Sequence, residues 1–269
     1  MQEKLPRASF QKILSDDKSL YEFLHNWEVY GLVLIKGAPL SMGQVRKVAE
    51  RIAFIRRTHY GEEFSVIAKP NPSNVAYDAG PLQLHADLPY YQYKPGAELL
   101  HCIVQAEGSG GANTLVDGLH LAEMMRVQDP HSFNLLSSVH VDWSDIGVED
   151  GEPFHKIHQA PILCLHPVTQ ELERINFSQP QRDSFFRIPL HIVEPWYRAL
   201  KAFHAMAMDP SNCMTLKLNP GDMLAFDNIR ILHGRKDFGT HLSRHIEGCY
   251  VDWDEVRSKS RVLEGALAS

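Results

Sequence analysis

The sequence lacks the features that mark membrane, secreted and nucleic-acid-binding proteins. No stretch approaches the roughly 18 consecutive apolar residues of a membrane span, and residues 1–10 hold no apolar core of a secretory signal. There is no run of basic residues, and 27 Lys and Arg against 33 Asp and Glu give a formal net charge of -6, which disfavours duplex nucleic acid as a partner. We therefore expect a cytoplasmic protein that binds a small molecule, with neither nucleic acid nor membrane as partner; a monomer and a homodimer both stay open.

Common cofactor and nucleophile motifs are also missing. The four cysteines are far apart and form no C-x-x-C pair, which argues against a structural zinc site and favours reduced thiols. The sequence contains no phosphate-binding loop, no dinucleotide-binding glycine motif, no G-x-S-x-G and no H-E-x-x-H. These absences leave a metal or cofactor site built from dispersed residues as the main route to catalysis.

The hydrophobic pattern predicts a mainly β protein with flanking helices. The 269 residues, 44% of them hydrophobic, suit a single domain over 1–269, with a helical N-terminal part over roughly 1–57. Beyond about residue 65, short apolar runs alternate with Gly, Pro, Asn and Asp, which is typical of strands and turns. We expect strands near 97–105, 112–118, 160–166, 171–177, 214–219, 222–226, 230–234 and 243–253, and helices near 19–31, 41–55, 119–128 and 191–208. This order predicts a jelly-roll barrel, the double-stranded β-helix, with a hairpin turn at 219–222.

Four residues carry the strongest chemical signal. His85 and Asp87 are separated by one residue, so on a strand both side chains point to the same face. His233 follows a distant apolar strand, and Arg244 comes eleven residues later. Two histidines and one carboxylate form the facial triad of non-haem Fe(II) oxygenases, and arginine offers a bidentate fork to the distal carboxylate of a 2-oxo acid. H-x-D alone is more often a polar strand edge, but the four residues together favour an iron and 2-oxoglutarate site.

An ordered series of motifs extends this interpretation to a family. The motifs are NVAY (74–77), LHAD (84–87), LLHCI (99–103), VDG (116–118), RINF (174–177), NPGD (219–222), FDNIRILHGR (226–235) and SRHIEGCYVDWD (243–254). With them the chain resembles the taurine-dioxygenase-like Fe(II)/2-oxoglutarate oxygenases over roughly 30–265, and within that family the branch that hydroxylates γ-butyrobetaine, followed by the branch acting on trimethyllysine. Vertebrate members of the first branch begin with a small zinc-binding domain, whereas this chain starts where the catalytic domain would start.

The resemblance implies a role for each matching residue. His85, Asp87 and His233 would bind Fe(II), and Arg244 would hold the 2-oxoglutarate C5 carboxylate. A trimethylammonium group would lie in an aromatic cage, and the substrate carboxylate would meet asparagine amides. The matching positions are Tyr60, Phe64, Tyr77 and Tyr250 for the cage and Asn74 and Asn176 for the carboxylate. A quaternary ammonium has no N–H to donate, so its recognition depends on cation–π contact and shape, although each of these rings taken singly is more often part of a core.

Two positions depart from the pattern that the resemblance implies. Phe64 stands where tryptophan is expected, which weakens cation binding because tryptophan has the strongest ring quadrupole. Val104 stands where a lysine is expected to help hold 2-oxoglutarate. Without that lysine, only Thr114 or Asn113 would help Arg244 to hold 2-oxoglutarate.

The expected function is hydroxylation of a small betaine-type carboxylate, first of all γ-butyrobetaine to L-carnitine. The expected cofactor and co-substrates are Fe(II), 2-oxoglutarate and O₂, with ascorbate as an optional reductant. One alternative keeps the chemistry and changes the substrate to another amino acid, quaternary ammonium or carboxylate. An alternative of another class is a non-catalytic β-barrel that binds a quaternary ammonium ligand.

Overall fold

Two facing sheets form the centre of the computed structural model, which describes residues 5–67, 80–108, 110–149, 151–238 and 243–268. The larger sheet runs in the order β1 (Arg7–Ser9), β2 (Leu32–Lys36), β12 (Met223–Asp227), β5 (Ala97–Val104), β14 (His245–Val251) and β3 (Glu63–Ile67). The smaller sheet runs in the order β11 (Cys213–Leu216), β6 (Asn113–Asp117), β13 (Ile231–Arg235) and β4 (Leu82–His85). The predicted mainly β jelly-roll core with flanking helices is confirmed.

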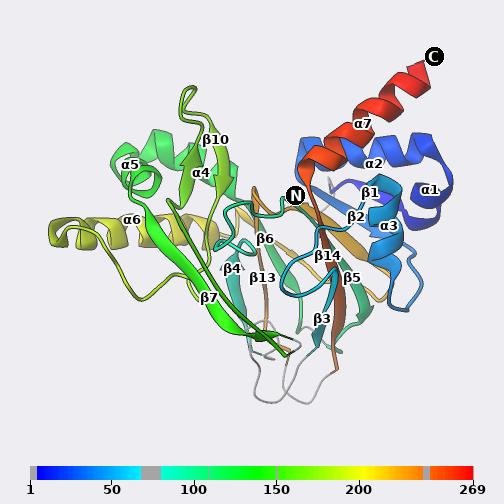
Figure 1. Ribbon diagram of the computed structural model, residues 1–269, viewed down its shortest axis with the longest axis horizontal. Helices are drawn as coiled ribbons and strands as arrows, with labels where there is room; N and C mark the ends of the chain where they lie inside the picture. Colours follow the sequence, from blue (N-terminus) through cyan, green and yellow to red (C-terminus); the bar gives the residue numbers. More distant parts are fainter. Residues whose placement is uncertain (1–4, 68–79, 109, 150, 239–242, 269) are drawn as a thin grey trace.

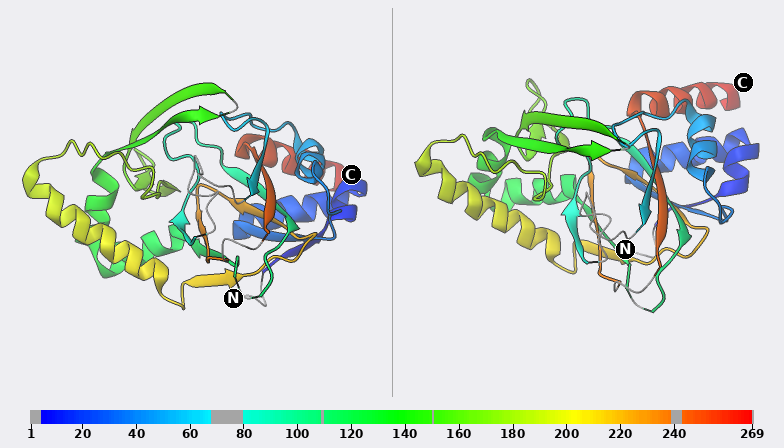
Figure 2. Two further views of the ribbon diagram at one scale, coloured as in Figure 1. Left: turned by 90° about the horizontal axis from the view of Figure 1, so that it is seen from below. Right: turned by 60° about the horizontal axis from the view of Figure 1, so that its bottom comes forward.

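Helices cover the outer face of each sheet (Figure 1). On the larger sheet they are α1 (Phe10–Ser15), α2 (Asp17–Tyr30), α3 (Gln44–Ile52) and α7 (Trp253–Ala268); on the smaller sheet they are α4 (Gly118–Gln128), α5 (Pro130–Ser138) and α6 (Leu190–Met208). Figure 2 shows the two helical groups on opposite sides of the strands. None of the described helices is long and apolar enough to cross a membrane.

Strand alternation divides the buried side chains into three cores. Along β12, Met223 and Ala225 pack toward α1–α3 and α7, whereas Leu224 and Phe226 pack between the two sheets. The third core lies between the smaller sheet and α4–α6. Because successive side chains of a strand point to opposite faces, each sheet can support a helical layer on one side and a cavity on the other.

Several expected boundaries are confirmed and others are wrong. Helix α2 ends at Gly31, whose φ of 69° and N–H bond to Trp27 make it the C-cap. Its N-cap is Asp16, which accepts a hydrogen bond from the Ser19 N–H, so the helix begins two residues before the start expected at 19. The turn at 219–222 does not form a hairpin, because β11 and β12 belong to different sheets.

Two features were not expected from the sequence. A long antiparallel ribbon, β7 (Val141–Glu149) with β8 (Glu152–Ala160), extends along one side of the sheets (Figure 2). The short pair that follows it, β9 (Leu163–Leu165) and β10 (Leu172–Ile175), lies within the strands expected near 160–166 and 171–177. The final helix α7 was not expected, although Trp253, Val256 and Leu263 form a helical stripe that packs on the larger sheet.

Candidate active site

A cavity lies between the inner faces of the two sheets. Its lining includes all three residues of the expected triad, the expected arginine and four aromatic rings, which come from β3, β4, β13 and β14 and the segments beside them. Residues that are up to 190 positions apart in the sequence therefore meet in one enclosed space. This arrangement is the one that a small-molecule site requires.

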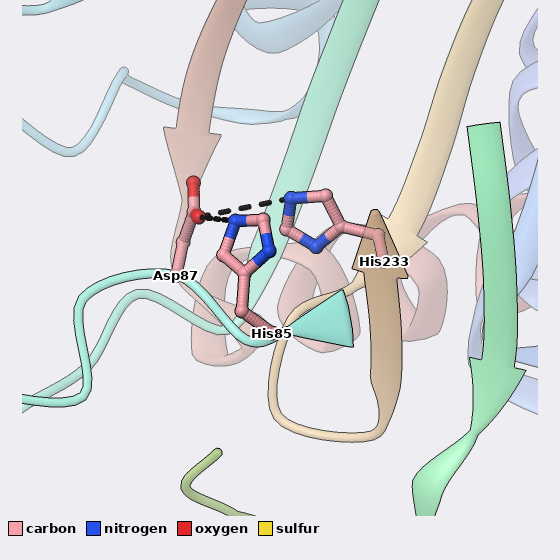
Figure 3. A group of neighbouring side chains, drawn as sticks. All are labelled: His85, Asp87 and His233. Atoms are coloured by element: carbon pink, nitrogen blue, oxygen red, sulfur yellow. Dashed lines mark ion pairs between the residues drawn. The ribbon is translucent and has the colours of Figure 1, made fainter. Parts of the chain in front are cut away.

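His85, Asp87 and His233 converge on one point at the wall of this cavity (Figure 3). The Asp87 Oδ1 atom lies 3.1 Å from His85 Nε2 and 3.7 Å from His233 Nε2. One ligand atom of each residue lies within 4.8 Å of the others. Among the described residues this is the one His, Cys, Asp or Glu group that meets this criterion.

Backbone pairing places the triad. His233 on β13 lies directly opposite His85, the last residue of β4. Asp87 lies beyond the strand and not on it, so the expected strand alternation does not position its carboxylate. Instead Asn228, which is fully buried, accepts a hydrogen bond from the Asp87 N–H at 2.7 Å and donates one to the Asp87 carbonyl at 3.1 Å.

The protonation states suit metal binding. Burial, followed by the charge of His85, lowers the pKa of His233 to about 3, so its imidazole is neutral at pH 7 and has a free lone pair. Burial would raise the pKa of Asp87, but its contact with His85 and the hydrogen bond from Tyr250 hold it below its usual range. His85 Nδ1 lies 2.8 Å from the Gln83 carbonyl; because that oxygen only accepts, Nδ1 carries the proton and Nε2 faces the carboxylate.

The donor set fits a divalent first-row metal ion. Ligand atoms about 2.0–2.2 Å from a metal and adjacent to one another lie roughly 3 Å apart, which is close to the two distances from Asp87 Oδ1. Nitrogen donors with one carboxylate match the facial triad of Fe(II) oxygenases. The hydrogen bond from His85 Nδ1 to a backbone carbonyl is the outer contact that orients a metal-bound imidazole.

Arg244 lies in the same cavity at the start of β14. It is 6% exposed, and its Nε has no hydrogen-bond partner in the described part of the chain. Burial, then the neighbouring Arg235, lowers its pKa to about 10, so it stays charged at pH 7. Two adjacent buried guanidinium groups attract a carboxylate, and Arg235 was missed by the sequence analysis although it follows His233 by two residues.

Of the two residues expected to assist Arg244, only Asn113 lines the cavity. Its Nδ2 has no hydrogen-bond partner within the described ranges, so it can donate to a ligand oxygen. The expectation for Thr114 is wrong, because Thr114 is the next residue on β6, points to the other face and does not line the cavity. Val104 is 40% exposed and also outside the lining. Position 104 therefore does not face the cofactor pocket, contrary to the expectation from the sequence.

Three of the four expected cage rings come together. The Phe64 and Tyr250 ring centroids are 5.2 Å apart, and those of Tyr60 and Phe64 are 6.5 Å apart. The Tyr250 hydroxyl also donates a hydrogen bond of 2.5 Å to Asp87 Oδ2, so this ring links the aromatic wall to the triad. Tyr77 and Asn74 lie outside the described residues.

Asn176 is not where the resemblance placed it. Its side chain is 1% exposed and donates to the Cys164 sulfur at 3.4 Å, and it does not line the cavity. Residues just beyond it, Ser178 and Gln181, do line the cavity. The expected carboxylate contact by Asn176 is therefore corrected, because this amide is buried behind the wall.

The comparisons with known proteins bear on the same site. The model of the taurine catabolism dioxygenase TauD, TfdA family matches residues 2–250. The chain belongs to this family. Gamma-butyrobetaine dioxygenase from Homo sapiens is 39% identical over 262 residues, which cover 97% of this chain and 67% of the relative. Trimethyllysine dioxygenase, mitochondrial, from Bos taurus is 33% identical over 262 residues, which cover 97% of this chain and 62% of the relative.

Solved structures support the fold of this TauD-family chain. A taurine dioxygenase from Burkholderia xenovorans superposes with a TM-score of 0.64 at 14% identity, covering 92% of this chain and 88% of the other. As a TauD-family member the protein is a dioxygenase that uses Fe(II), 2-oxoglutarate and O₂. The His-Asp-His group is the site in the described chain with the donor chemistry for the iron.

Lengthening the Asp87 side chain tests the metal site. Asp87→Glu adds one methylene, which displaces the carboxylate by more than the ~0.2 Å tolerance of a metal–ligand distance. We expect Mn(II) affinity, measured by anaerobic EPR titration, to fall by more than the roughly 10- to 100-fold that loss of an outer-sphere partner costs. Asp254→Glu, on the exposed side of α7, is the matched control and should bind as the wild type does. Unchanged affinity in Asp87→Glu would remove Asp87 from the ligand set.

Arg244→Lys tests the cofactor end of the cavity. Lysine keeps the charge but loses the bidentate fork, and hydrogen bonds to charged groups contribute about 1.5–3 kcal/mol. We expect the KM for 2-oxoglutarate to rise roughly 10- to 100-fold, measured by succinate release. Val104→Lys should leave that KM unchanged, because position 104 lies outside the cavity; a lower KM in Val104→Lys would contradict the described lining.

Proposed function

We propose that the protein hydroxylates a small betaine-type carboxylate, with γ-butyrobetaine as the preferred substrate and L-carnitine as the product, and that residues 1–269 act as one catalytic domain. One observation carries this proposal: the hydroxyl of Tyr250 donates to the carboxylate of Asp87, while the ring of Tyr250 packs against that of Phe64 with 5.2 Å between the centroids. The metal-binding group and the aromatic wall therefore share a residue. A cation held by the rings would place its alkyl chain beside the metal position.

Different residues of the cavity bind the metal ion and the co-substrate. When bound, Fe(II) with 2-oxoglutarate supplies the activation of O₂ that hydroxylates an unactivated C–H bond while the 2-oxo acid is converted to succinate and CO₂. His85, Asp87 and His233 would hold the ion through two imidazole nitrogens and one carboxylate. Arg244 and Asn113 orient the co-substrate carboxylate, and the enclosing sheets exclude water from the reacting atoms.

The aromatic wall favours a trimethylammonium head group. Tyr60, Phe64 and Tyr250 present ring faces and edges at centroid separations of 5.2 and 6.5 Å. Each ring contributes ~0.5–2 kcal/mol to the binding of a desolvated cation. A trimethylammonium loses little on leaving water, whereas a primary ammonium would lose strong hydrogen bonds to water. One relative is named trimethyllysine dioxygenase. Trimethyllysine is therefore the first alternative substrate to test.

A comparison of two substrates tests the proposal. γ-Butyrobetaine and γ-aminobutyrate share one carbon chain and differ only in the three methyl groups. With Fe(II), 2-oxoglutarate and ascorbate present, we expect succinate release with γ-butyrobetaine to exceed that with γ-aminobutyrate by at least roughly tenfold in kcat/KM. Equal turnover would overturn the betaine assignment and leave the dioxygenase class intact. Faster turnover of trimethyllysine would move the substrate to the other branch of the family.

A further inference from the structure

The aromatic wall continues behind the cavity into the β7–β8 ribbon. Phe154 of β8 packs on the ring of His59 with 4.3 Å between the centroids, and His59 packs on Tyr60 at 4.0 Å. Tyr60 lines the cavity, whereas His59 and Phe154 lie behind its lining. With Phe64 and Tyr250 these side chains form a continuous row of rings from the ribbon to the metal-binding group.

Hydrogen bonds fix His59 in this row. The Tyr91 hydroxyl accepts from the His59 backbone N–H at 3.1 Å and lies 2.9 Å from Nδ1 of its ring. The same ring lies 5.8 Å from that of Tyr90, which also lines the cavity. Burial, then the charge of Lys156, lowers the pKa of His59 to about 4. The imidazole is therefore neutral at pH 7 and puts no positive charge behind a wall that would bind a cation.

A tight turn fixes the backbone of Tyr60. Thr58 and Gly61 exchange backbone hydrogen bonds of 2.9 and 3.1 Å, and Thr58 Oγ1 accepts from the Tyr60 N–H at 3.1 Å. Gly61 has a φ of 89°, in the region that favours glycine. The Tyr60 ring can therefore move mainly by rotation of its side chain, and the His59 ring at 4.0 Å restricts that rotation.

We propose that His59 is a positioning residue that holds the Tyr60 ring in the orientation in which it contacts the cationic head group of the substrate. The inference deepens the proposed function and rests on it. A cation is attracted to the face of an aromatic ring and not to its edge, so the orientation of Tyr60 decides how much that ring contributes. Removing the ring that packs on Tyr60 leaves space in which Tyr60 can take other rotamers.

A double-mutant cycle tests whether His59 acts through Tyr60. The dissociation constant of γ-butyrobetaine is measured anaerobically by calorimetry on protein loaded with Fe(II) and 2-oxoglutarate. We expect His59→Ala to weaken binding roughly fivefold or more in the wild-type background and less than about twofold in a Tyr60→Ala background. His59→Phe keeps a ring on Tyr60 and should bind within about twofold of the wild type. His155→Ala, at an exposed position of β8 beside Phe154, is the matched control and should bind as the wild type does.

The possible outcomes separate this inference from the proposed function. Equal weakening by His59→Ala in both backgrounds, no weakening in either, or equal weakening by His59→Phe and His59→Ala would overturn the role of His59. A comparable loss of 2-oxoglutarate affinity in His59→Ala would overturn it as well, because the role is confined to the aromatic wall. Coupled weakening without hydroxylation of γ-butyrobetaine would support His59 while the proposed reaction fails.

A wild-type protein that does not bind γ-butyrobetaine would overturn both the inference and the proposed function. If His59→Ala does not fold, as judged by circular dichroism, Tyr91→Phe takes its place in the cycle. That variant removes the hydroxyl that holds the imidazole, and it should likewise weaken binding only where Tyr60 is present.

Discussion

The antiparallel pairing of β13 with β4 sets the metal-binding geometry. It puts His233 directly opposite His85, and because the side-chain period of a strand is two residues, a slip of one residue would turn one imidazole away from the cavity. The third ligand depends on a different device, since Asp87 lies beyond the strand and is held through its backbone by Asn228. The site therefore requires both a strand register and a buried amide.

The charges of the cavity follow from which strand faces line it. Arg235 and Arg244 enter from β13 and the start of β14, whereas Glu98 and Tyr250 lie further along β5 and β14. Burial strengthens each of these electrostatic interactions because the surroundings have a low dielectric constant. The buried guanidinium groups therefore attract an anionic co-substrate at one end of the cavity, and aromatic rings line the other end.

The sequence predicted the strands and the triad because both have local signatures: apolar runs between turn residues, H-x-D, and a His followed by an Arg. It did not predict side-chain direction. Thr114 and Asn113 are neighbours of similar polarity, and only the pairing of β6 decides which one faces the cavity. Asn176 was misplaced for the same reason, and Asn228 was missed because its role is a contact with a residue 141 positions earlier.

We propose that His85, Asp87, His233 and Arg244 form one iron and 2-oxoglutarate site. The most direct test is the visible absorption that appears when 2-oxoglutarate chelates Fe(II) in the absence of O₂. The account predicts a weak charge-transfer band in the wild-type protein that saturates at one iron per chain and is lost in His233→Ala, with the variant still folded. A wild-type protein without the band, or a variant with an unchanged band, would contradict the claim.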